Sequence, residues 1–434
     1  MLHLLRKITP KWAFLMYHRT LSWLAATWYG HPSKKLIVIG VTGTNGKSST
    51  SYFLAKALEA TGAKTGMTST AMFKVADREW TNATKMTMLG RFRSQKLLRE
   101  MVNAGCAYAV IETSSQGILQ YRHRDIAYDG CVFTNLTPEH IEAHGGFENY
   151  KRAKMELFSF VSSLPSKVIH GTKIPRIAIV NYDDEHAKDF AHAWGESKVV
   201  WYGLHEGASR RAVGIEVAPD HVAFDVDGHR CVLHTPGEVM VYNALAALTA
   251  AEAYGMPLAG AIERLASVQG MPGRYESIDE GQPFTVIVDY AYEPVALEKL
   301  FAFAHALKKD GRIIHLTGSA GGGRDVGRRK VIGELSAKKA DITIVTNEDP
   351  YDEDPMQIMT NVAEAAVQAG KRDGESLFRI LDRGEAIQKA ISLARPGDVV
   401  LITGKGSEPV MAVERGHKIP WDDRGEVRKA LRTA

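Results

Sequence analysis

Short apolar runs alternate with longer amphipathic stretches along most of this chain. Runs of strand length occupy residues 36–39, 65–70, 108–111, 131–133 and 177–181. Stretches with the apolar spacing of a helix lie between them, at 51–60, up to about 102, and at 147–161. Continuous apolar runs bounded by turn residues are typical of parallel strands that are buried on both faces. The first half of the chain therefore predicts an α/β domain with a parallel sheet.

The pattern changes at about residue 199. From there to 233, short alternating segments predict a small antiparallel patch, and helices are expected at 241–254 and 258–267. After a Met-Pro-Gly-Arg linker, apolar strands return at 285–288, 313–316, 342–345, 378–381 and 399–402. These strands and the helical stretches between them predict a second, doubly wound domain of the Rossmann-like kind. A glycine cluster at 318–323 lacks the spacing of a dinucleotide loop, so we expect no NAD(P) site there.

The stretch after the first strand has the most specific motif. Residues 43–48 read Gly-Thr-Asn-Gly-Lys-Ser and lead into a helix, which is the order of a P-loop. Glycines let backbone N–H groups close around phosphate oxygens, and the helix directs its positive end at them. Val41 stands where the full pattern has a glycine. We predict a nucleotide site formed by Gly43, Thr44, Asn45, Gly46, Lys47, Ser48 and Ser49.

Several polar residues near this loop are candidates for metal binding. Lys47 would reach the β- and γ-phosphates of the nucleotide, and Ser48 would offer its hydroxyl to Mg²⁺. Glu112 follows a buried strand, and the carboxyl ends of parallel strands are where α/β domains bind ligands. Its carboxylate is a candidate Mg²⁺ ligand. His140 is a second candidate, although a histidine in this position that stood alone would be a solvated loop residue.

Composition places the chain among ordinary globular proteins. Its 434 residues are too many for one core and predict two or three domains. The 54 basic and 50 acidic residues nearly balance, and no basic or aromatic stripe is evident, so we expect no nucleic-acid partner and no P-loop motor on nucleic acid. The three scattered cysteines fit a reducing cytoplasm.

The first 35 residues differ from the rest of the chain. No Asp or Glu occurs before Glu59, while six Lys or Arg residues up to position 35 are interleaved with apolar ones. His18 and Arg19 interrupt the apolar run, so we expect neither a signal peptide nor a membrane-spanning helix. Two interpretations remain open: helices packed on the next domain, or a helix in residues 1–30 lying on the anionic inner face of a membrane.

Further motifs follow in order along the chain. Residues 132–140 read Val-Phe-Thr-Asn-Leu-Thr-Pro-Glu-His, and Tyr-Lys-Arg-Ala-Lys occupies 150–154. With the glycine loop, these closely resemble the Mur ligase family, as do the motifs at 112–115, 144–145, 242–244, 272–274, 289–291, 324–325 and 404–406. The resemblance extends from about residue 36 to the carboxyl end. It is greatest for the ligases that add the third amino acid to a UDP-N-acetylmuramoyl-peptide.

This resemblance implies an ATP-dependent amide ligase of peptidoglycan precursor synthesis. ATP converts a carboxylate of the UDP-N-acetylmuramoyl-peptide into an acyl phosphate, which the amino group of the incoming amino acid attacks. In the family pattern Lys47 and Ser48 hold the phosphates and Mg²⁺, and Glu112 and His140 bind metal. Lys154 matches a lysine that is carbamylated in the family. We therefore predict Lys47, Glu112, His140 and Lys154 as the catalytic residues.

The same resemblance implies further binding residues. Asn243 matches a residue that contacts adenine, and Arg274 and Asp289 match residues that reach the ATP phosphate and ribose. Together with the motifs above, the resemblance divides the chain into three parts. These are a basic amphipathic helical segment (1–35), a P-loop ATP-binding domain (36–271) and a Rossmann-like ligase domain (272–434). We predict substrate binding by Thr84, Thr113, Ser114, Arg324, Glu348, Asp349 and Glu408.

Departures from the family pattern bear on the substrates. Only 35 residues precede the P-loop strand, where these ligases carry a uridine-binding domain. The Asp-Asn-Pro-Arg motif that selects diaminopimelate is replaced by Glu-Asp-Pro-Tyr at 348–351, which removes the guanidinium fork that suits a second carboxylate. We therefore favour another amino acid, such as lysine or ornithine. Gln116, Tyr292 and Ser407 replace family histidines, but the ATP and metal residues remain, so we expect an active enzyme.

Two other functions remain open at this point. One is a related Mur-type ligase that acts on a non-muropeptide or lipid-linked acid, such as a folylpolyglutamate or a cyanophycin-like polymer. The other is a membrane-associated ATP-binding protein with little turnover. The Tyr-Lys-Arg-Ala-Lys run and the Pro-Gly-Arg linker favour the muropeptide ligase.

Overall fold

The computed structural model describes residues 11–139, 144–195, 198–308, 310–323 and 326–433. The chain forms two compact units, each described here by itself. The first contains the residues up to Gly214, with Phe224–Cys231 and Val241–Ser267. The second contains Ile215–Ala223, Val232–Met240 and the chain from Val268 onward.

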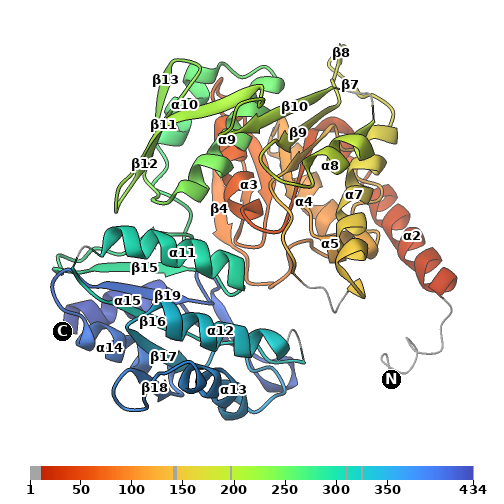
Figure 1. Ribbon diagram of the computed structural model, residues 1–434. Helices are drawn as coiled ribbons and strands as arrows, with labels where there is room; N and C mark the ends of the chain where they lie inside the picture. Colours follow the sequence, from red (N-terminus) through yellow and green to blue (C-terminus); the bar gives the residue numbers. More distant parts are fainter. Residues whose placement is uncertain (1–10, 140–143, 196–197, 309, 324–325, 434) are drawn as a thin grey trace. The chain divides into compact units, whose positions relative to one another are not determined.

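The first unit is built on a parallel sheet (Figure 1). Its strands lie in the order β13-β12-β11-β10-β9-β6-β1-β5-β2-β3-β4. The parallel centre consists of β10 (Val199–Gly203), β9 (Ile177–Asn181), β6 (Gly130–Phe133), β1 (Ile37–Thr42), β5 (Tyr108–Glu112) and β2 (Thr65–Thr68). Since β1, β5, β6 and β9 are buried almost throughout, their apolar runs are what a sheet covered on both faces requires.

Helices cover both faces of this sheet. On one face, α4 (Arg91–Asn103), α7 (Phe147–Ser163) and α8 (Ala187–Trp194) contribute to a single core that includes Leu98, Leu157 and Phe190. On the other, α3 (Lys47–Ala57) packs against β1, β5, β2 and α10 (Leu258–Ala266). The remaining helices associated with this unit are α2 (Lys11–Trp28), η1 (Pro32–Lys35), α5 (Ser115–Leu119) and α9 (Glu238–Ala253).

Two parts of this sheet differ from the sequence prediction. β10 pairs in parallel with β9 and with β11 (Arg210–Val217), so the expected antiparallel patch does not begin at residue 199. An antiparallel hairpin of β3 (Met72–Val75) and β4 (Arg78–Thr81) was not predicted and forms the sheet edge beyond β2. The other short strands are β7 (Val168–Ile169), β8 (Thr172–Lys173), β12 (Val222–Val226) and β13 (His229–Leu233).

The second unit has a doubly wound sheet with the order β14-β15-β19-β16-β17-β18. β15 (Thr285–Asp289), β19 (Val399–Thr403), β16 (Ile313–Thr317), β17 (Ile342–Thr346) and β18 (Leu377–Ile380) are parallel, and β14 (Glu276–Ser277) is antiparallel. All five predicted strands are present. The expected α/β fold class, a P-loop domain with a parallel sheet and a Rossmann-like domain, is confirmed.

Helices lie on both faces of the second sheet as well. α14 (Arg383–Leu393) and α15 (Asp423–Thr433) share a core with the strands. α11 (Pro294–Leu307), α12 (Val326–Lys339) and α13 (Pro355–Gln368) pack on one another and on the sheet. The small elements are β20 (Val410–Ala412), η2 (Glu414–Gly416) and β21 (Lys418–Pro420).

Buried polar and sulfur-containing side chains add detail to these cores. Arg383 of α14 and Asp423 of α15 form a bidentate ion pair with both distances at 2.7 Å, and neither side chain is exposed. The three cysteines are free thiols in the interior, and burial raises the pKa of each. No helix within the described part of the chain has the length and apolar content needed to cross a bilayer.

Candidate active site

Two glycines shape the P-loop through conformations that other residues rarely adopt. Gly46 has a φ of 78° and caps the amino terminus of α3. Gly43 has a φ of 148°, and a Cβ at this position would lie 1.9 Å from the Thr134 hydroxyl oxygen. A Cβ on Gly46 would lie 2.2 Å from Asn243 Oδ1. Glycine has no Cβ and avoids both clashes. The backbone N–H groups of the loop and the positive end of α3 can therefore face the same phosphate.

Residues at the end of β6 clamp this loop. The Thr44 N–H donates to the Asn135 carbonyl at 2.8 Å, and the Asn45 N–H donates to Asn135 Oδ1 at 2.9 Å. Thr134 Oγ1 donates to the Asn45 carbonyl at 2.7 Å. Tyr150 Oη of α7 lies 3.0 Å from Thr44 Oγ1. Sequence reasoning placed Asn135 within the 132–140 motif but gave it no role, because its contact with the loop joins residues 90 positions apart.

An oxygen-rich group lies beside the loop. Ser48 Oγ donates to Glu112 Oε2 at 2.8 Å, and both side chains are buried. Thr70 donates its N–H to Glu112 Oε2 at 2.7 Å and its hydroxyl to Oε1 at 2.9 Å. Sequence reasoning missed Thr70, which belongs to none of the motifs. The hydroxyl of Ser48 and the carboxylate of Glu112 are oxygen donors of the kind that Mg²⁺ prefers.

Two lysines contact carbonyl oxygens of the loop. Lys47 Nζ donates to the Thr44 carbonyl, and Lys154 Nζ of α7 donates to the Gly43 carbonyl, each at 2.5 Å. Lys154 is buried and its Nζ lies 4.7 Å from the centroid of the Tyr150 ring. Burial, and then the charge of Lys47, lower the pKa of Lys154 well below its usual value. Lys154 is therefore in a site that favours its neutral amine.

The other predicted residues of the first unit have local partners. Asn243 Oδ1 accepts from Thr50 Oγ1 at 3.3 Å, and Asn243 lies beside Gly46. Thr113 Oγ1 donates to the Ile111 carbonyl at 3.0 Å, and Ser114 caps α5 by accepting from the Gly117 N–H at 3.2 Å. Thr84 Oγ1 donates to Asn82 Oδ1 at 2.6 Å. Ser49 is buried in the first turn of α3.

Arg274 and Asp289 lie close together in the second unit. The guanidinium carbon of Arg274 is 4.3 Å from the centroid of the Tyr290 ring. Asp289, at the end of β15, accepts from the Tyr275 N–H at 2.7 Å and the Ala291 N–H at 2.6 Å. Burial raises the pKa of Asp289, although Arg274 and these hydrogen bonds oppose the rise.

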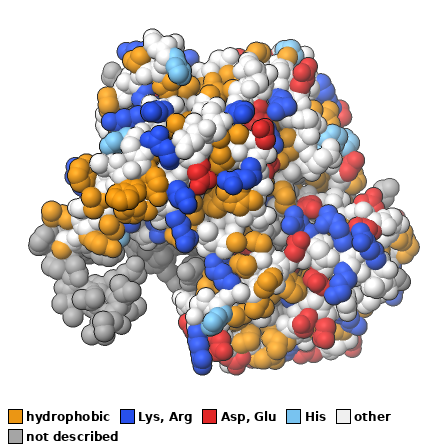
Figure 2. Space-filling model, turned by 180° about the vertical axis from the view of Figure 1, so that it is seen from behind, with side chains coloured by type: hydrophobic (Ala, Val, Ile, Leu, Met, Phe, Trp, Pro, Cys, Tyr) orange, Lys and Arg blue, Asp and Glu red, His pale blue; other side chains and the backbone are white. Residues whose placement is uncertain are grey.

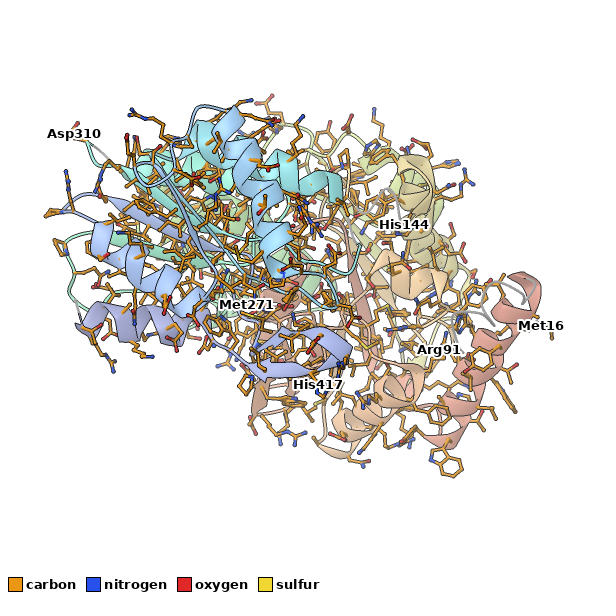
Figure 3. The ribbon with its side chains drawn as sticks, turned by 90° about the horizontal axis from the view of Figure 1, so that it is seen from below. Met16, Arg91, His144, Met271, Asp310 and His417 are labelled. Carbon is orange, nitrogen blue, oxygen red and sulfur yellow. The ribbon has the colours of Figure 1, made fainter. Side chains whose placement is uncertain are left out.

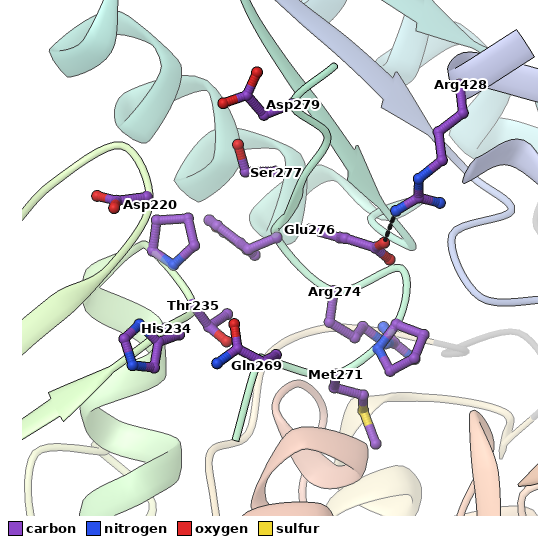
Figure 4. A pocket seen from close by; sticks show the side chains of 14 residues that line it. Asp220, His234, Thr235, Gln269, Met271, Arg274, Glu276, Ser277, Asp279 and Arg428 are labelled. Carbon is purple, nitrogen blue, oxygen red and sulfur yellow. Dashed lines mark hydrogen bonds and ion pairs between the residues drawn. The ribbon is translucent and has the colours of Figure 1, made fainter. Parts of the chain in front are cut away.

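Arg274 also borders a cavity of about 540 Å³ in the second unit (Figure 4). Glu276 and Arg428, which form an ion pair at 3.1 Å, lie on its wall. None of the other predicted site residues of the described chain lines this cavity.

Three predicted carboxylates of the second unit lie near Lys405. Lys405 Nζ donates to Asp349 Oδ1 at 2.9 Å and to Glu408 Oε2 at 2.6 Å. Glu348 is buried, and burial together with the charge of Asp349 raises the pKa of Glu348 to about 7. Sequence reasoning placed Lys405 within a motif but gave it no role, and here it neutralises two of the predicted residues.

Two predicted site residues lie outside the described residues, namely His140 and Arg324. Asp325, which follows Arg324, lies outside them as well. Within the described ranges, no group of three or more His, Cys, Asp or Glu side chains is arranged to hold a metal ion. In the first unit the structure thus brings five predicted residues together around one loop: Lys47, Ser48, Glu112, Lys154 and Asn243. In the second unit it brings Arg274 close to Asp289. It also groups Glu348, Asp349 and Glu408 near Lys405.

Comparison with known proteins identifies the family. The Mur ligase middle domain matches residues 41–251, and the Mur ligase glutamate ligase domain matches residues 273–406. A UDP-N-acetylmuramyl-tripeptide synthetase of Roseiflexus sp. (strain RS-1) is 41% identical over 415 residues, which cover 94% of this chain and 81% of the relative. The chain belongs to the Mur ligase family. Mur ligases are ATP-dependent ligases, so the predicted family and enzyme class are confirmed.

Other relatives carry the name of a specific reaction. A UDP-N-acetylmuramoyl-L-alanyl-D-glutamate–2,6-diaminopimelate ligase of Geobacillus thermodenitrificans (strain NG80-2) is 36% identical, over 95% of this Mur ligase and 82% of the relative. A solved structure of a ligase with the same name is 28% identical, with a TM-score of 0.60 over 92% of this chain and 78% of that one.

Proposed function

We propose that this Mur ligase joins an amino acid to the peptide carboxylate of UDP-N-acetylmuramoyl-L-Ala-D-Glu in peptidoglycan precursor synthesis. The observation that supports it most is the arrangement around the P-loop, in which Ser48 contacts Glu112 and Lys154 contacts the Gly43 carbonyl. A loop for nucleotide phosphates and an oxygen-donor pair for a metal ion within one site support carboxylate activation by ATP. The names of the relatives supply the acceptor peptide.

Each loop residue has a task in this reaction. Lys47 and the amino terminus of α3 bind the phosphates of ATP and neutralise charge as the terminal phosphoryl group moves to the substrate carboxylate. Asn135, Thr134 and Tyr150 keep the loop in one conformation, so little reorganisation is needed at the moment of transfer. Asn243 adjoins Gly46 and would contact the nucleotide beside the loop.

The residues present fit Mg²⁺. Ser48 Oγ and Glu112 Oε2 are 2.8 Å apart, and both are hard oxygen donors. Mg²⁺ commonly takes one or two protein ligands and completes its shell with water and substrate phosphates, so two donors suffice. When bound there, the ion would neutralise phosphate charge.

Lys154 contributes through its unusual ionisation. Because burial and Lys47 lower its pKa, its amine is available in the neutral form that reacts with carbon dioxide to give a carbamate. Its formation releases a proton, and the resulting anion is attracted to Lys47, whereas the ammonium form of Lys154 would be repelled. We propose this modified side chain as a further oxygen ligand near the Ser48–Glu112 pair.

The amino acid that is added is proposed to be lysine or ornithine. The 348–351 motif has Tyr351 in its last position and thus no guanidinium to bind a second carboxylate. Lysine and ornithine lack that second carboxylate, so neither amino acid needs the guanidinium. We further propose domain boundaries at 35/36 and 271/272, and a cytoplasmic location that is peripheral to the inner membrane face.

The test is phosphate release by the purified protein with ATP, Mg²⁺ and UDP-N-acetylmuramoyl-L-Ala-D-Glu, across a panel of amino acids that includes lysine, ornithine and diaminopimelate. We expect stimulation by lysine or ornithine and a product of the matching mass. Lys47→Ala is the control and should abolish both.

Other outcomes separate the alternatives. Stimulation by diaminopimelate alone would reject the amino acid assigned here and leave the reaction standing. Phosphate release that responds only to a lipid-linked acid or to a folate would replace the acceptor. ATP hydrolysis that responds to no pair of acid and amine would favour an ATP-binding protein with little turnover.

A further inference from the structure

Helix α2 exposes apolar side chains on the face opposite its packing partner. It packs on α4, and Ser22, Ala25 and Ala26 are buried. At 3.6 residues per turn, the residues on the other side share one face, and the large apolar ones among them are exposed: Met16, Tyr17, Trp23, Leu24 and Trp28. Trp23 is 53% exposed and Trp28 is 79% exposed. An exposed apolar patch of this kind indicates an interaction site.

The same part of the surface is strongly basic. The sequences of α2, η1 and α4 as far as Arg99 contain eight Lys or Arg residues and no Asp or Glu, whereas the whole chain has 54 basic and 50 acidic residues. Exposed among the eight are Arg19, Lys34, Lys35, Arg93 and Lys96. The next residue, Glu100, is paired with Arg78 at 3.1 Å.

Contacts between α2, η1 and α4 make them one surface. Arg99 Nε of α4 donates to the Tyr29 carbonyl at 2.9 Å, just beyond α2, and α4 also packs on η1. Met16 of α2 and Arg91 of α4 lie on the same side of the first unit (Figure 3). Phe92 of α4 adds a further apolar side chain that is 42% exposed. Hydrophobic side chains gather beside basic ones in this region (Figure 2). We call the exposed residues of α2, η1 and α4 the basic apolar surface.

We propose that the basic apolar surface binds an anionic phospholipid bilayer. Tryptophan and leucine side chains partition into the headgroup boundary of a bilayer, and Lys and Arg at the rim are attracted to anionic headgroups. A second copy of this chain is a poor occupant, because a symmetric contact would bring the exposed Lys and Arg residues of two such surfaces against each other. The proposal does not depend on the ligase reaction.

The test uses purified full-length protein sedimented with vesicles at low salt. One set contains phosphatidylcholine alone, and in the other about a third of the lipid is phosphatidylglycerol. We expect the protein to sediment with the anionic vesicles only. Raising the salt to about 0.5 M should release most of it, since it shortens the range of the charge interactions.

Two double variants assign the binding to this surface. Trp23→Ser with Trp28→Ser should lower the apparent affinity for anionic vesicles about tenfold or more. Arg93→Glu with Lys96→Glu should do the same, because each basic residue contributes about fivefold. Their matched controls lie in the second unit: Val331→Ser with Val367→Ser, and Lys338→Glu with Lys339→Glu, all at exposed positions. These should bind as the unsubstituted protein does.

Other results would overturn the proposal. One is failure of the unsubstituted protein to bind anionic vesicles. Equal losses in the test and control variants would likewise show that this surface is not responsible. Concentration-dependent dimerisation that the tryptophan variant abolishes, without vesicle binding, would assign the surface to a second copy. Phosphate release on soluble substrate should be unchanged in the tryptophan variant, so loss of vesicle binding is distinguishable from failure of the proposed ligase function.

Discussion

Lys154 is a basic side chain at a position where a charge is costly. It is buried, it lies near Lys47, and its Nζ donates to the Gly43 carbonyl at 2.5 Å. Desolvation and a like charge both disfavour the ammonium form. The residue is therefore favoured as a neutral amine, or as a carbamate whose negative charge Lys47 attracts, over a permanent cation.

Lys154→Ala tests this role. We expect phosphate release to fall about a hundredfold or more, as is common when a group that stabilises phosphoryl transfer is lost. Added formate or acetate should restore part of the activity by placing a carboxylate where the carbamate stood. Lys151→Ala, on the same helix but paired with Asp189 at 2.8 Å, is the matched control and should remain active. A fully active Lys154→Ala protein would refute the proposal.

Glu348 makes the stability of the second unit depend on pH. Its pKa is raised from 4.5 to about 7 by burial and by Asp349. Between these values the folded state binds a proton that the unfolded chain releases, so the free energy of unfolding falls as the pH rises. The total loss is about 3 kcal/mol.

The comparison that checks this is chemical denaturation at pH 5 and pH 8. The glutamine of Glu348→Gln cannot titrate. Between pH 5 and pH 8, the free energy of unfolding of this variant should therefore fall by about 3 kcal/mol less than that of the unsubstituted protein. Glu375→Gln alters an exposed carboxylate that pairs with Arg372 and should leave the pH dependence unchanged. Parallel curves for all three proteins would show that Glu348 is ionised in the folded state.

At the scale of elements, the ion pair of Arg383 and Asp423 joins α14 to α15. Both side chains are fully buried, and Arg383 also donates to the Thr403 carbonyl at 2.8 Å at the end of β19. Removing one partner of a buried pair leaves an uncompensated charge, which costs about 3–5 kcal/mol. The pair thus fixes two helices against the sheet.

Asp423→Asn should lower the free energy of unfolding by about 3 kcal/mol or more, measured by urea denaturation. The chain offers a control of similar geometry in Arg379 and Asp373, which are 2.6 Å apart but 32% and 55% exposed. Asp373→Asn should cost less than about 1 kcal/mol, because solvent screens an exposed pair. Equal losses would mean that burial is not what makes the first pair strong.

Burial on both faces of the sheets explains which strands could be predicted from the sequence. The strands β1, β5, β6 and β9 and the five parallel strands of the second unit were predicted because burial on both faces requires continuous apolar runs. The β3–β4 hairpin was missed because its turn is Ala76-Asp77, with Ala76 at a φ of 51° and none of the glycine that marks most two-residue turns. The start of α3 was placed at Ser51 instead of Lys47 because the loop residues themselves form its first turn.

Some site residues could be predicted from the local sequence and others could not. The P-loop glycines and Lys47 could be predicted because their spacing reflects local backbone geometry. The contacts of Thr70 with Glu112 and of Asn135 with the loop could not, because they join positions 42 and 90 residues apart. Nothing in the local sequence records which distant side chain will lie there.

For the whole molecule, the two units have separate hydrophobic cores. One core is built from β1, β5, β6 and the helices α4, α7 and α8, and the other from β15, β16, β19 and the helices α14 and α15. Cores that share no residues can unfold in separate steps. Ligand bound to one unit should then stabilise that unit's transition.

Scanning calorimetry should therefore resolve two transitions. Mg²⁺ and ATP at about a hundredfold excess over the dissociation constant should raise one of them by about 5–10 °C. Gly43→Ala should remove this shift, because its Cβ would meet Thr134 Oγ1 at 1.9 Å and displace the loop. Gly62→Ala, where a Cβ meets nothing within 4 Å, controls for glycine replacement at a positive φ. A single transition that moves as a whole would contradict independent unfolding.

The buried thiol of Cys131 gives this protein an internal reporter of its own opening. Cys131 lies in β6, two positions before the strand end that leads to the loop clamp at Thr134 and Asn135, and it has no exposed surface. A thiol reagent can reach it only when that strand separates from the sheet, so the labelling rate measures a local opening equilibrium. With Cys106 and Cys231 replaced by alanine, ATP should slow the labelling of Cys131 in proportion to the fraction of protein that holds nucleotide. Nucleotide occupancy could then be followed without a dye, a coupled enzyme or turnover.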